Sequence, residues 1–285
     1  MIELVIGPTS EQIAVHTPYV MEAGGELNLF YSRADYPPGQ AGEACRKKYN
    51  IFRATSVDGG KTWKEGSQPI IERKDTVCRP WVVEEGGGGY RMFYVERLHP
   101  MAGVFRVFAA TSSDLESWQV ESEAAIPECG DCEHIATPCV VKANGKLRMY
   151  FTGARCHKDG DSLYVAESGD GKKFKVDKEP KFKPGKGTAY EKSCYAPFVY
   201  EDGSKWRMLF SGYGSAVRGW RTYLSESNDG LKFKKGKLVI DLSDDDRFKH
   251  GAYKAVLHGD QVYFVGVDGQ QRASIYRAPR TDFGL

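Results

Sequence analysis

The chain has 285 residues with 40 basic and 38 acidic side chains, so its formal net charge at neutral pH is only +2. Hydrophobic residues make up 41% and charged residues 27%, values typical of a globular protein that buries a core. This balance offers no basic excess for a nucleic-acid partner, and no stretch reaches the roughly 20 apolar residues that span a bilayer.

The N-terminal segment, MIELVIGPTSEQ, lacks the basic region followed by an apolar run that marks a secretory signal. Seven cysteines, an odd number at irregular spacing, are typical of free thiols in a reducing compartment. We therefore expect a cytoplasmic protein that binds neither nucleic acid nor membrane.

One repeat unit runs along the chain, and its copies open with a strand led by a proline. These opening strands read TPYV at 17–20, RPWV at 79–82, TPCV at 137–140 and APFV at 196–199. A glycine-bearing turn and a second strand follow each of them, and the second strands read LNLFYS, YRMFYV, LRMYFT and WRMLFS. Their alternation of polar and apolar residues is the mark of a strand with two unlike faces.

A third strand then leads into a Ser-x-Asp turn followed by an aromatic residue. The four copies of this turn begin at Ser56, Ser112, Ser168 and Ser227, which lie 56, 56 and 59 residues apart. Asp or Asn caps such a turn, glycine takes the positive φ angle, and the aromatic residue anchors the returning strand. We expect these turns to be structural.

A fifth copy begins with HGAYKAV at 250–256 and continues through strands at 262–265 and about 273–277, after which no fourth strand follows. The strand-like segment from Ile2 to Ile6 is predicted to supply this missing outer strand. A β-sandwich would not need so regular a repeat. The sequence therefore predicts an all-β fold, a single five-bladed β-propeller over residues 1–285, with four antiparallel strands per blade and the last blade closed by the N-terminal strand.

The long irregular segments before each first strand and after each second strand converge on one mouth of such a ring, where binding groups usually lie. They are rich in arginine, histidine and aromatic residues. Arginine forks bind carboxylate or phosphate, and aromatic faces stack on sugar rings, although some arginines simply tie loops together. We expect a polar or anionic small-molecule substrate, and the oligomeric state stays open. The candidate substrate-binding residues are His16, Arg33, Asp35, Arg79, Arg97, His134, Arg155, Tyr195, Tyr213 and His250.

These units resemble the blades of the five-bladed glycosidase superfamily, which includes glycoside hydrolase families 32, 43, 62, 68, 117 and 130. The resemblance covers the whole chain at the level of the repeat, and the turn at 56–63 also looks like the Asp-box of the six-bladed sialidases. In family 43, the resemblance implies an Asp before each of two blade prolines and a Glu two residues before another. Here those positions hold Thr17, Thr137 and Tyr195, whereas His250-Gly251 looks like the family's His-Gly at the fifth blade.

Glycosidic cleavage normally needs two carboxyl groups across the bond, so other carboxylates at the mouth are the candidates. We assign acid–base catalysis to Glu96, which follows a second strand, and to Glu133 and Glu191, which precede first strands. Salt bridges to neighbouring basic residues are the structural alternative for each.

The segment CGDCEH at 129–134 offers metal-like ligands, but no second half-site for zinc follows it. We expect no metal and no cofactor, while a metal at His250 or at Cys129, Cys132 and His134 stays an open question. A nucleophilic Cys–His pair is a further alternative, with these candidates: Cys78 or Cys194 with His16 or His134.

The leading prediction is a glycosidase-like carbohydrate-active enzyme that acts on a small glycoside or sugar derivative in the funnel. One alternative is a repurposed propeller enzyme, such as a cyclase, lyase or isomerase, that acts on a small polar metabolite. The other is a non-catalytic module that binds sugar or protein. Two carboxyl groups about 5–10 Å apart would favour the first function, an acid–base pair beside a closed pocket the second, and a shallow aromatic groove the third.

Overall fold

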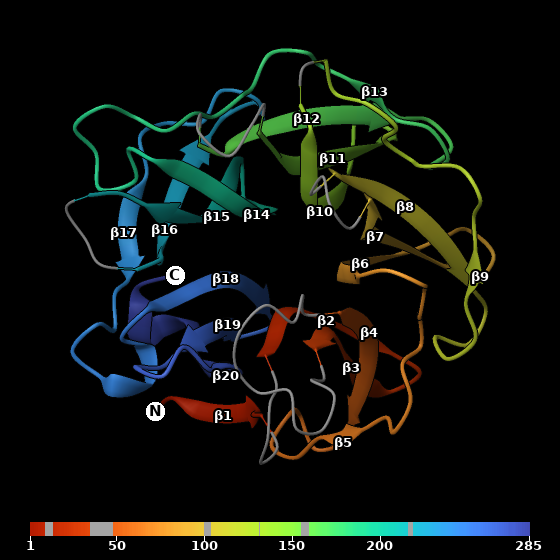
Figure 1. Cartoon of the computed structure of the whole chain (residues 1–285), viewed down its shortest axis with the longest axis horizontal. Coiled ribbons are helices and arrows are strands. Elements are labelled where there is room, and N and C mark those ends of the chain that lie inside the picture. The colour runs from red at the N-terminus through yellow and green to blue at the C-terminus, as the bar shows by residue number, and fades with distance from the viewer. Residues whose placement is uncertain (9–13, 35–47, 100–103, 131, 155–159, 216–218) are drawn as a thin grey trace.

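The computed structural model describes residues 1–8, 14–34, 48–99, 104–130, 132–154, 160–215 and 219–285 (Figure 1). Within these ranges the long elements are all strands, and the helices are two short 3-10 turns, η1 (Asp246–Phe248) and η2 (Arg280–Phe283). No helix in this part of the chain has the length and apolar character to cross a membrane. The prediction of an all-β protein is confirmed.

Most strands pair antiparallel with the strands next to them in the sequence, in groups of four. One sheet contains β2 (Ala14–Ala23), β3 (Glu26–Ala34), β4 (Tyr49–Ser56) and β5 (Lys64–Glu65). Another contains β14 (Ser193–Asp202), β15 (Lys205–Tyr213), β16 (Arg221–Ser227) and β17 (Lys237–Ile240).

Two further groups of four strands join into one eight-stranded sheet. The first group is β6 (Val77–Glu84), β7 (Tyr90–His99), β8 (Val104–Ser112) and β9 (Gln119–Val120). The second is β10 (His134–Ala143), β11 (Lys146–Ala154), β12 (Ser162–Ser168) and β13 (Lys175–Val176). A single parallel pairing, between His134 and Phe105, joins the two groups.

The last sheet brings together the two ends of the chain. It contains β18 (Gly251–His258), β19 (Gln261–Val267), β20 (Ala273–Pro279) and, beside β20, the N-terminal strand β1 (Glu3–Ile6). Glu3 stands opposite Arg277, and a salt bridge of 2.6 Å joins the two side chains. The predicted role of the N-terminal strand as the outer strand of this sheet is therefore confirmed.

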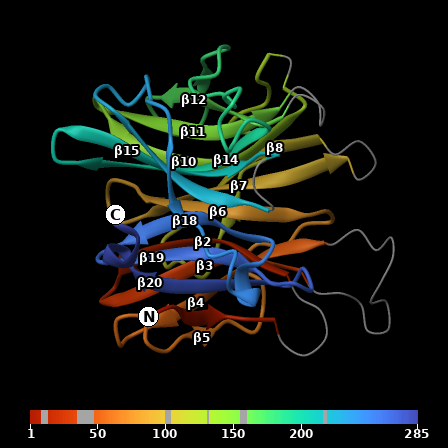
Figure 2. The ribbon, with the colours of Figure 1, turned by 90° about the vertical axis from the view of Figure 1, so that its left-hand side faces the viewer.

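The first strands of these groups, β2, β6, β10, β14 and β18, surround a common centre (Figure 1). Each of these strands contacts the next around the centre, and β18 contacts β2. Figure 2 shows β18 to β20 beside β2 and β3, so the first and last groups in the sequence are neighbours in space. The described strands form no closed hydrogen-bonded sheet, and the groups meet mainly by packing of their side chains.

The core lies between the sheets and is rich in aromatic rings. Tyr31, Tyr94, Phe151 and Phe210 occupy the same place in four second strands, and none is more than 1% exposed. Burying a side chain of this size contributes about 1.5–3 kcal/mol. The repeat is therefore a packing repeat as well as a sequence pattern.

The Ser-x-Asp turns hold the far ends of the third strands through hydrogen bonds. The Ser56 hydroxyl donates to Asp58 at 2.7 Å and accepts the N–H of Gly60 at 2.9 Å, while the Trp63 indole donates to the carbonyl of Gly60. Hydrogen bonds from neighbouring groups hold the pKa of Asp58 below its usual range. These contacts agree with a structural role.

Candidate functional site

The central strands share an unusual backbone feature halfway along their length. Pairing between the first and second strand shifts register at the same place in every group, which marks a β-bulge. A non-glycine residue in each bulge has a φ angle between 49° and 61°, a conformation that L-residues rarely adopt. Such bulges re-aim side chains and cluster near functional sites. The residues concerned are Thr17, Arg79, Thr137, Ala196 and Lys254.

Hydroxyl groups on second strands hold three of these bulges in place. Each hydroxyl accepts a hydrogen bond from the main-chain N–H of the bulge residue in the following group. The pairs are Arg79 with Ser32 (2.8 Å), Ala196 with Thr152 (3.1 Å) and Lys254 with Ser211 (2.9 Å). Neighbouring groups are thus linked at the level of the bulges.

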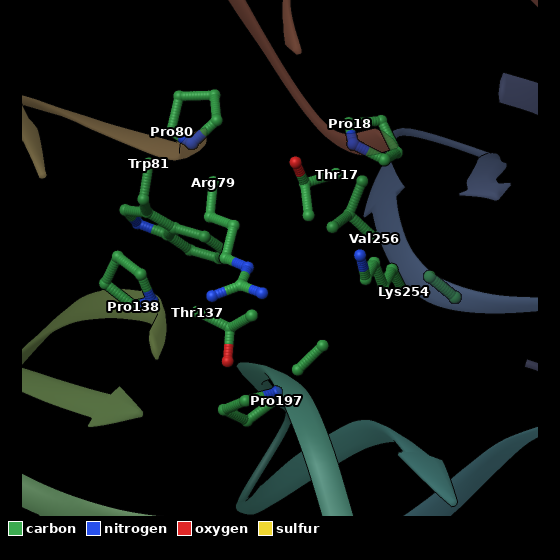
Figure 3. Close-up of a pocket in the computed structure, with 12 residues that line it drawn as sticks. Thr17, Pro18, Arg79, Pro80, Trp81, Thr137, Pro138, Pro197, Lys254 and Val256 are labelled. Carbon is green, nitrogen blue, oxygen red and sulfur yellow. The ribbon is translucent and has the colours of Figure 1, made fainter. Parts of the chain in front are cut away.

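The five bulges enclose a cavity at the centre of the molecule (Figure 3). Its volume is about 40 Å³ and it is open to solvent, so it has room for a small group of a ligand rather than for a whole ligand, since sites that enclose one have about 300–1,000 Å³. Its walls are Thr17, Pro18, Arg79, Pro80, Trp81, Thr137, Pro138, Ala196, Pro197, Lys254, Ala255 and Val256. The cavity lies where the resemblance to family 43 places catalytic carboxylates before blade prolines, but no carboxylate is among these wall residues.

Two cations enter this cavity. Figure 3 shows the side chains of Arg79 and Lys254 extending toward its middle from opposite walls. Both heads face the ring of Tyr195, with the Arg79 Cζ 5.5 Å and the Lys254 Nζ 5.6 Å from its centroid. Burial, which disfavours the charged amine, and repulsion by Arg79 lower the pKa of Lys254 to about 7.

An aromatic wall lies beside the cations. Trp220 stacks on Tyr253 with ring centroids 5.8 Å apart, and it also contacts Tyr195 at 5.6 Å and Tyr213 at 5.5 Å. Burial raises the pKa of Tyr253 to about 12, so its hydroxyl stays protonated at neutral pH. Cationic groups are attracted to aromatic faces, so these rings help to position Arg79 and Lys254.

The three predicted catalytic carboxylates lie outside the cavity wall. Glu96, on β7, makes a salt bridge of 3.4 Å with Arg73. Glu133 is exposed just before β10, where its main-chain N–H donates to the carbonyl of Ala154. Hydrogen bonds from Ser215 lower the pKa of Glu191. Their acid–base roles therefore stay predictions.

Three of the predicted binding residues gather around the ring of Phe105. Arg79 and Arg97 lie over its face, at 5.6 and 5.3 Å from the centroid, and the His134 ring meets it edge-on at 4.8 Å. Phe105 thus connects one cation of the cavity with two other candidate residues.

The remaining predicted binding residues are spread more widely. His16 contacts the ring of Tyr49 at 5.8 Å, and Arg33 covers Phe52 at 3.7 Å. His250 is exposed, and its main-chain carbonyl accepts a hydrogen bond from the N–H of Trp220. Asp35 and Arg155 lie outside the described residues.

The cysteine-rich segment is buried. Cys129 and Cys132 are both buried thiols, and the hydrogen bond between them, together with burial, raises the pKa of Cys129. In the described ranges, no group of three or more His, Cys, Asp or Glu residues is arranged to hold a metal ion.

Sequence reasoning missed Lys254, although a signal for it exists. Tyr253-Lys254-Ala255 in β18 aligns with Tyr195-Ala196-Pro197 in β14, because each tyrosine immediately precedes the bulge residue. The fifth copy lacks the proline that marks this position elsewhere, so the lysine is easily read as an ordinary strand residue.

Comparison with known proteins finds similarity in structure alone. No family model matches the sequence, and no curated protein matches it. Among solved structures, the complex of BT0996 with RGII superposes with a TM-score of 0.80 at 15% identity, covering 97% of this chain and 90% of that protein.

Two further solved structures show the same fold similarity. Zg3597, a family 117 glycoside hydrolase from Zobellia galactanivorans, gives a TM-score of 0.73 at 16% identity, with 97% and 88% covered. The β-1,2-mannobiose phosphorylase from Listeria innocua gives 0.73 at 13% identity, with 99% and 98% covered. These neighbours are glycoside hydrolases and a mannoside phosphorylase, so the resemblance to propeller glycosidases inferred from the repeat is confirmed at the level of the fold.

Proposed function

We propose that this chain, which has the fold of the propeller glycosidases, is a carbohydrate-active enzyme that acts on a small glycoside or sugar derivative in its central funnel. The groups of four strands and the order of the central strands support a propeller of five blades in one domain. The observation that carries the functional proposal is the central cavity, which has cations in its wall and the rings of Tyr195 and Trp220 beside it. Aromatic faces of this kind stack on sugar rings.

In the hydrolytic form of this proposal, the mouth carboxylates Glu96, Glu133 and Glu191 supply the acid and the base. A carboxyl pair on either side of a glycosidic bond protonates the leaving oxygen and activates water or attacks directly. Glu96 lies on β7, which contacts β10, whereas Glu133 immediately precedes β10. These two are therefore the pair to test first.

A second function is favoured by Lys254. An amine with a pKa of about 7 is half deprotonated at neutral pH, which is the range in which a general base works best. The described wall of the cavity contains no carboxylate that would compete for this role. A non-hydrolytic enzyme, a lyase, isomerase or cyclase on a small polar metabolite, is therefore the second candidate.

Product analysis by NMR separates these functions. The protein is incubated with neutral and acidic glycosides, alongside the Glu96→Gln, Glu133→Gln, Glu191→Gln and Lys254→Met variants. Hydrolysis that is lost in a Gln variant but kept in Lys254→Met would support a glycosidase. An unsaturated or rearranged product that is lost only in Lys254→Met would support the second function. Binding of a glycoside without any product would indicate a non-catalytic binding module.

A further inference from the structure

We propose that the central cavity binds the anionic group of an acidic sugar, a carboxylate or a phosphate monoester, between the side chains of Arg79 and Lys254. This inference rests on the proposed function, because it specifies which class of sugar derivative the funnel accepts.

The first support is the way in which the backbone aims these side chains. Arg79 and Lys254 both occupy bulges with positive φ, and a second-strand hydroxyl holds the main-chain N–H of each. Their heads converge on the same face of the cavity, at nearly equal distances from the Tyr195 ring. A strained backbone that presents two cations to one space is typical of a binding site.

The second support is the missing counter-charge. Among the described residues, no salt bridge joins Arg79 or Lys254 to a carboxylate, and the buried Nη1 atom of Arg79 has no hydrogen-bond partner. Asp161 acts on Arg79 electrostatically, but its carboxylate accepts a hydrogen bond of 2.7 Å from the Ser193 hydroxyl. The guanidinium of Arg79 and the protonated amine of Lys254 repel each other, and a bound anion would relieve this repulsion and give the Nη1 atom of Arg79 a hydrogen-bond partner.

The third support is the shape of the surroundings. The prolines of four bulges line the cavity, and the Tyr195 ring, which contacts the half-buried Trp220, lies beside Arg79 and Lys254. An arginine fork binds a carboxylate or phosphate through two parallel hydrogen bonds, and a lysine adds a point charge. This arrangement fits a single sugar that carries one acidic substituent better than it fits a neutral glycoside.

The test measures anion binding directly. The melting temperature of the full chain is measured at constant ionic strength while chloride is replaced by inorganic phosphate or by acetate. At least one of these anions is expected to raise it, because a ligand that binds only the folded protein stabilises it. In Arg79→Gln and in Lys254→Met, each compared with its own melting temperature in chloride, the shift should disappear. The exposed Lys237→Met variant serves as the matched control and should keep the shift.

Titration calorimetry with glucuronate, glucose 6-phosphate and glucose then identifies the source of the charge. Tighter binding of glucuronate indicates a carboxylate ligand, and tighter binding of glucose 6-phosphate indicates a phosphate. The preferred acid should bind at least about tenfold more tightly than glucose and lose about that factor in either variant.

Two results would overturn the inference. One is the absence of any effect of phosphate and acetate on the wild-type protein. The other is an effect that persists in both variants, which would locate the anion elsewhere. Turnover of neutral glycosides without anion binding would uphold the proposed function and reject the anion site. Anion binding without any turnover would uphold the anion site and reject the proposed function.

Discussion

Replacement of Lys254 by methionine is expected to stabilise the protein, most strongly in mildly acid solution. Burial and the charge of Arg79 lower the pKa of Lys254 from 10.5 to about 7. A difference of one in pKa is worth about 1.4 kcal/mol. The lowered pKa of Lys254 therefore means that the charged lysine costs the folded state about 5 kcal/mol. Methionine fills a similar volume and carries no charge, so the cost disappears.

The sign of the pH dependence follows from proton counting. Between pH 7 and 10.5 the unfolded chain holds a proton on Lys254 that the folded chain has released, so the wild-type protein gains stability as pH rises. The free energy of unfolding of Lys254→Met should therefore exceed that of the wild type by about 5 kcal/mol at pH 6 and by only about 2 kcal/mol at pH 9. Urea denaturation of both proteins at the two pH values measures these differences.

Lys237→Met is the control, because Lys237 is exposed on β17 and its replacement should change stability little at either pH. The reasoning would be refuted if Lys254→Met were no more stable than the wild type at pH 6. It would also be refuted if its advantage grew toward pH 9.

Three further substitutions test the scaffold. Gly60→Ala should cost about 2 kcal/mol or more, because Gly60 has φ +82° and a Cβ there would lie 2.8 Å from one side chain and 2.9 Å from another. Gly59→Ala, at φ +73° with no atom within 4 Å, should cost about 1 kcal/mol, and thermal denaturation compares the two. Ser211→Ala should cost about 1–3 kcal/mol by leaving the N–H of Lys254 without its acceptor, and should also weaken phosphate or acetate binding in the melting assay. Equal stability of Ser211→Ala and the wild type would contradict the proposed link between the groups.

The repeated strands could be predicted from the sequence because each of them follows a strong local rule. Period-two alternation, the Ser-x-Asp turns and the proline within four of the five central strands all recur at nearly constant spacing. The N-terminal strand was predictable in the same way, since the last group lacked one strand. Its pairing with β20 through Glu3 and Arg277 follows from closing that edge.

Lys254 illustrates why the site was harder to predict. In a regular strand, side chains alternate between two faces, and a lysine is expected on the solvent face. The bulge changes this alternation, and β18 lacks the proline that marks the bulge in the other four central strands.

The carboxylates at the mouth were hard to place for another reason. Glu133 and Glu191 lie between strands, where no periodic pattern fixes the direction of a side chain. The sequence assigned them to the mouth, but it could not show that Arg106 would bind the main-chain carbonyl of Glu133. It also could not show that Ser215 would engage the carboxylate of Glu191.

The most direct test of the central claim is a crystal structure of the protein soaked with glucuronate or glucose 6-phosphate, whichever binds more tightly in solution. The account predicts the acidic group between Arg79 and Lys254, with the sugar ring against Tyr195 and Trp220. A ligand bound elsewhere, with the central cavity unoccupied at saturating concentration, would contradict the assignment of this cavity as the functional site.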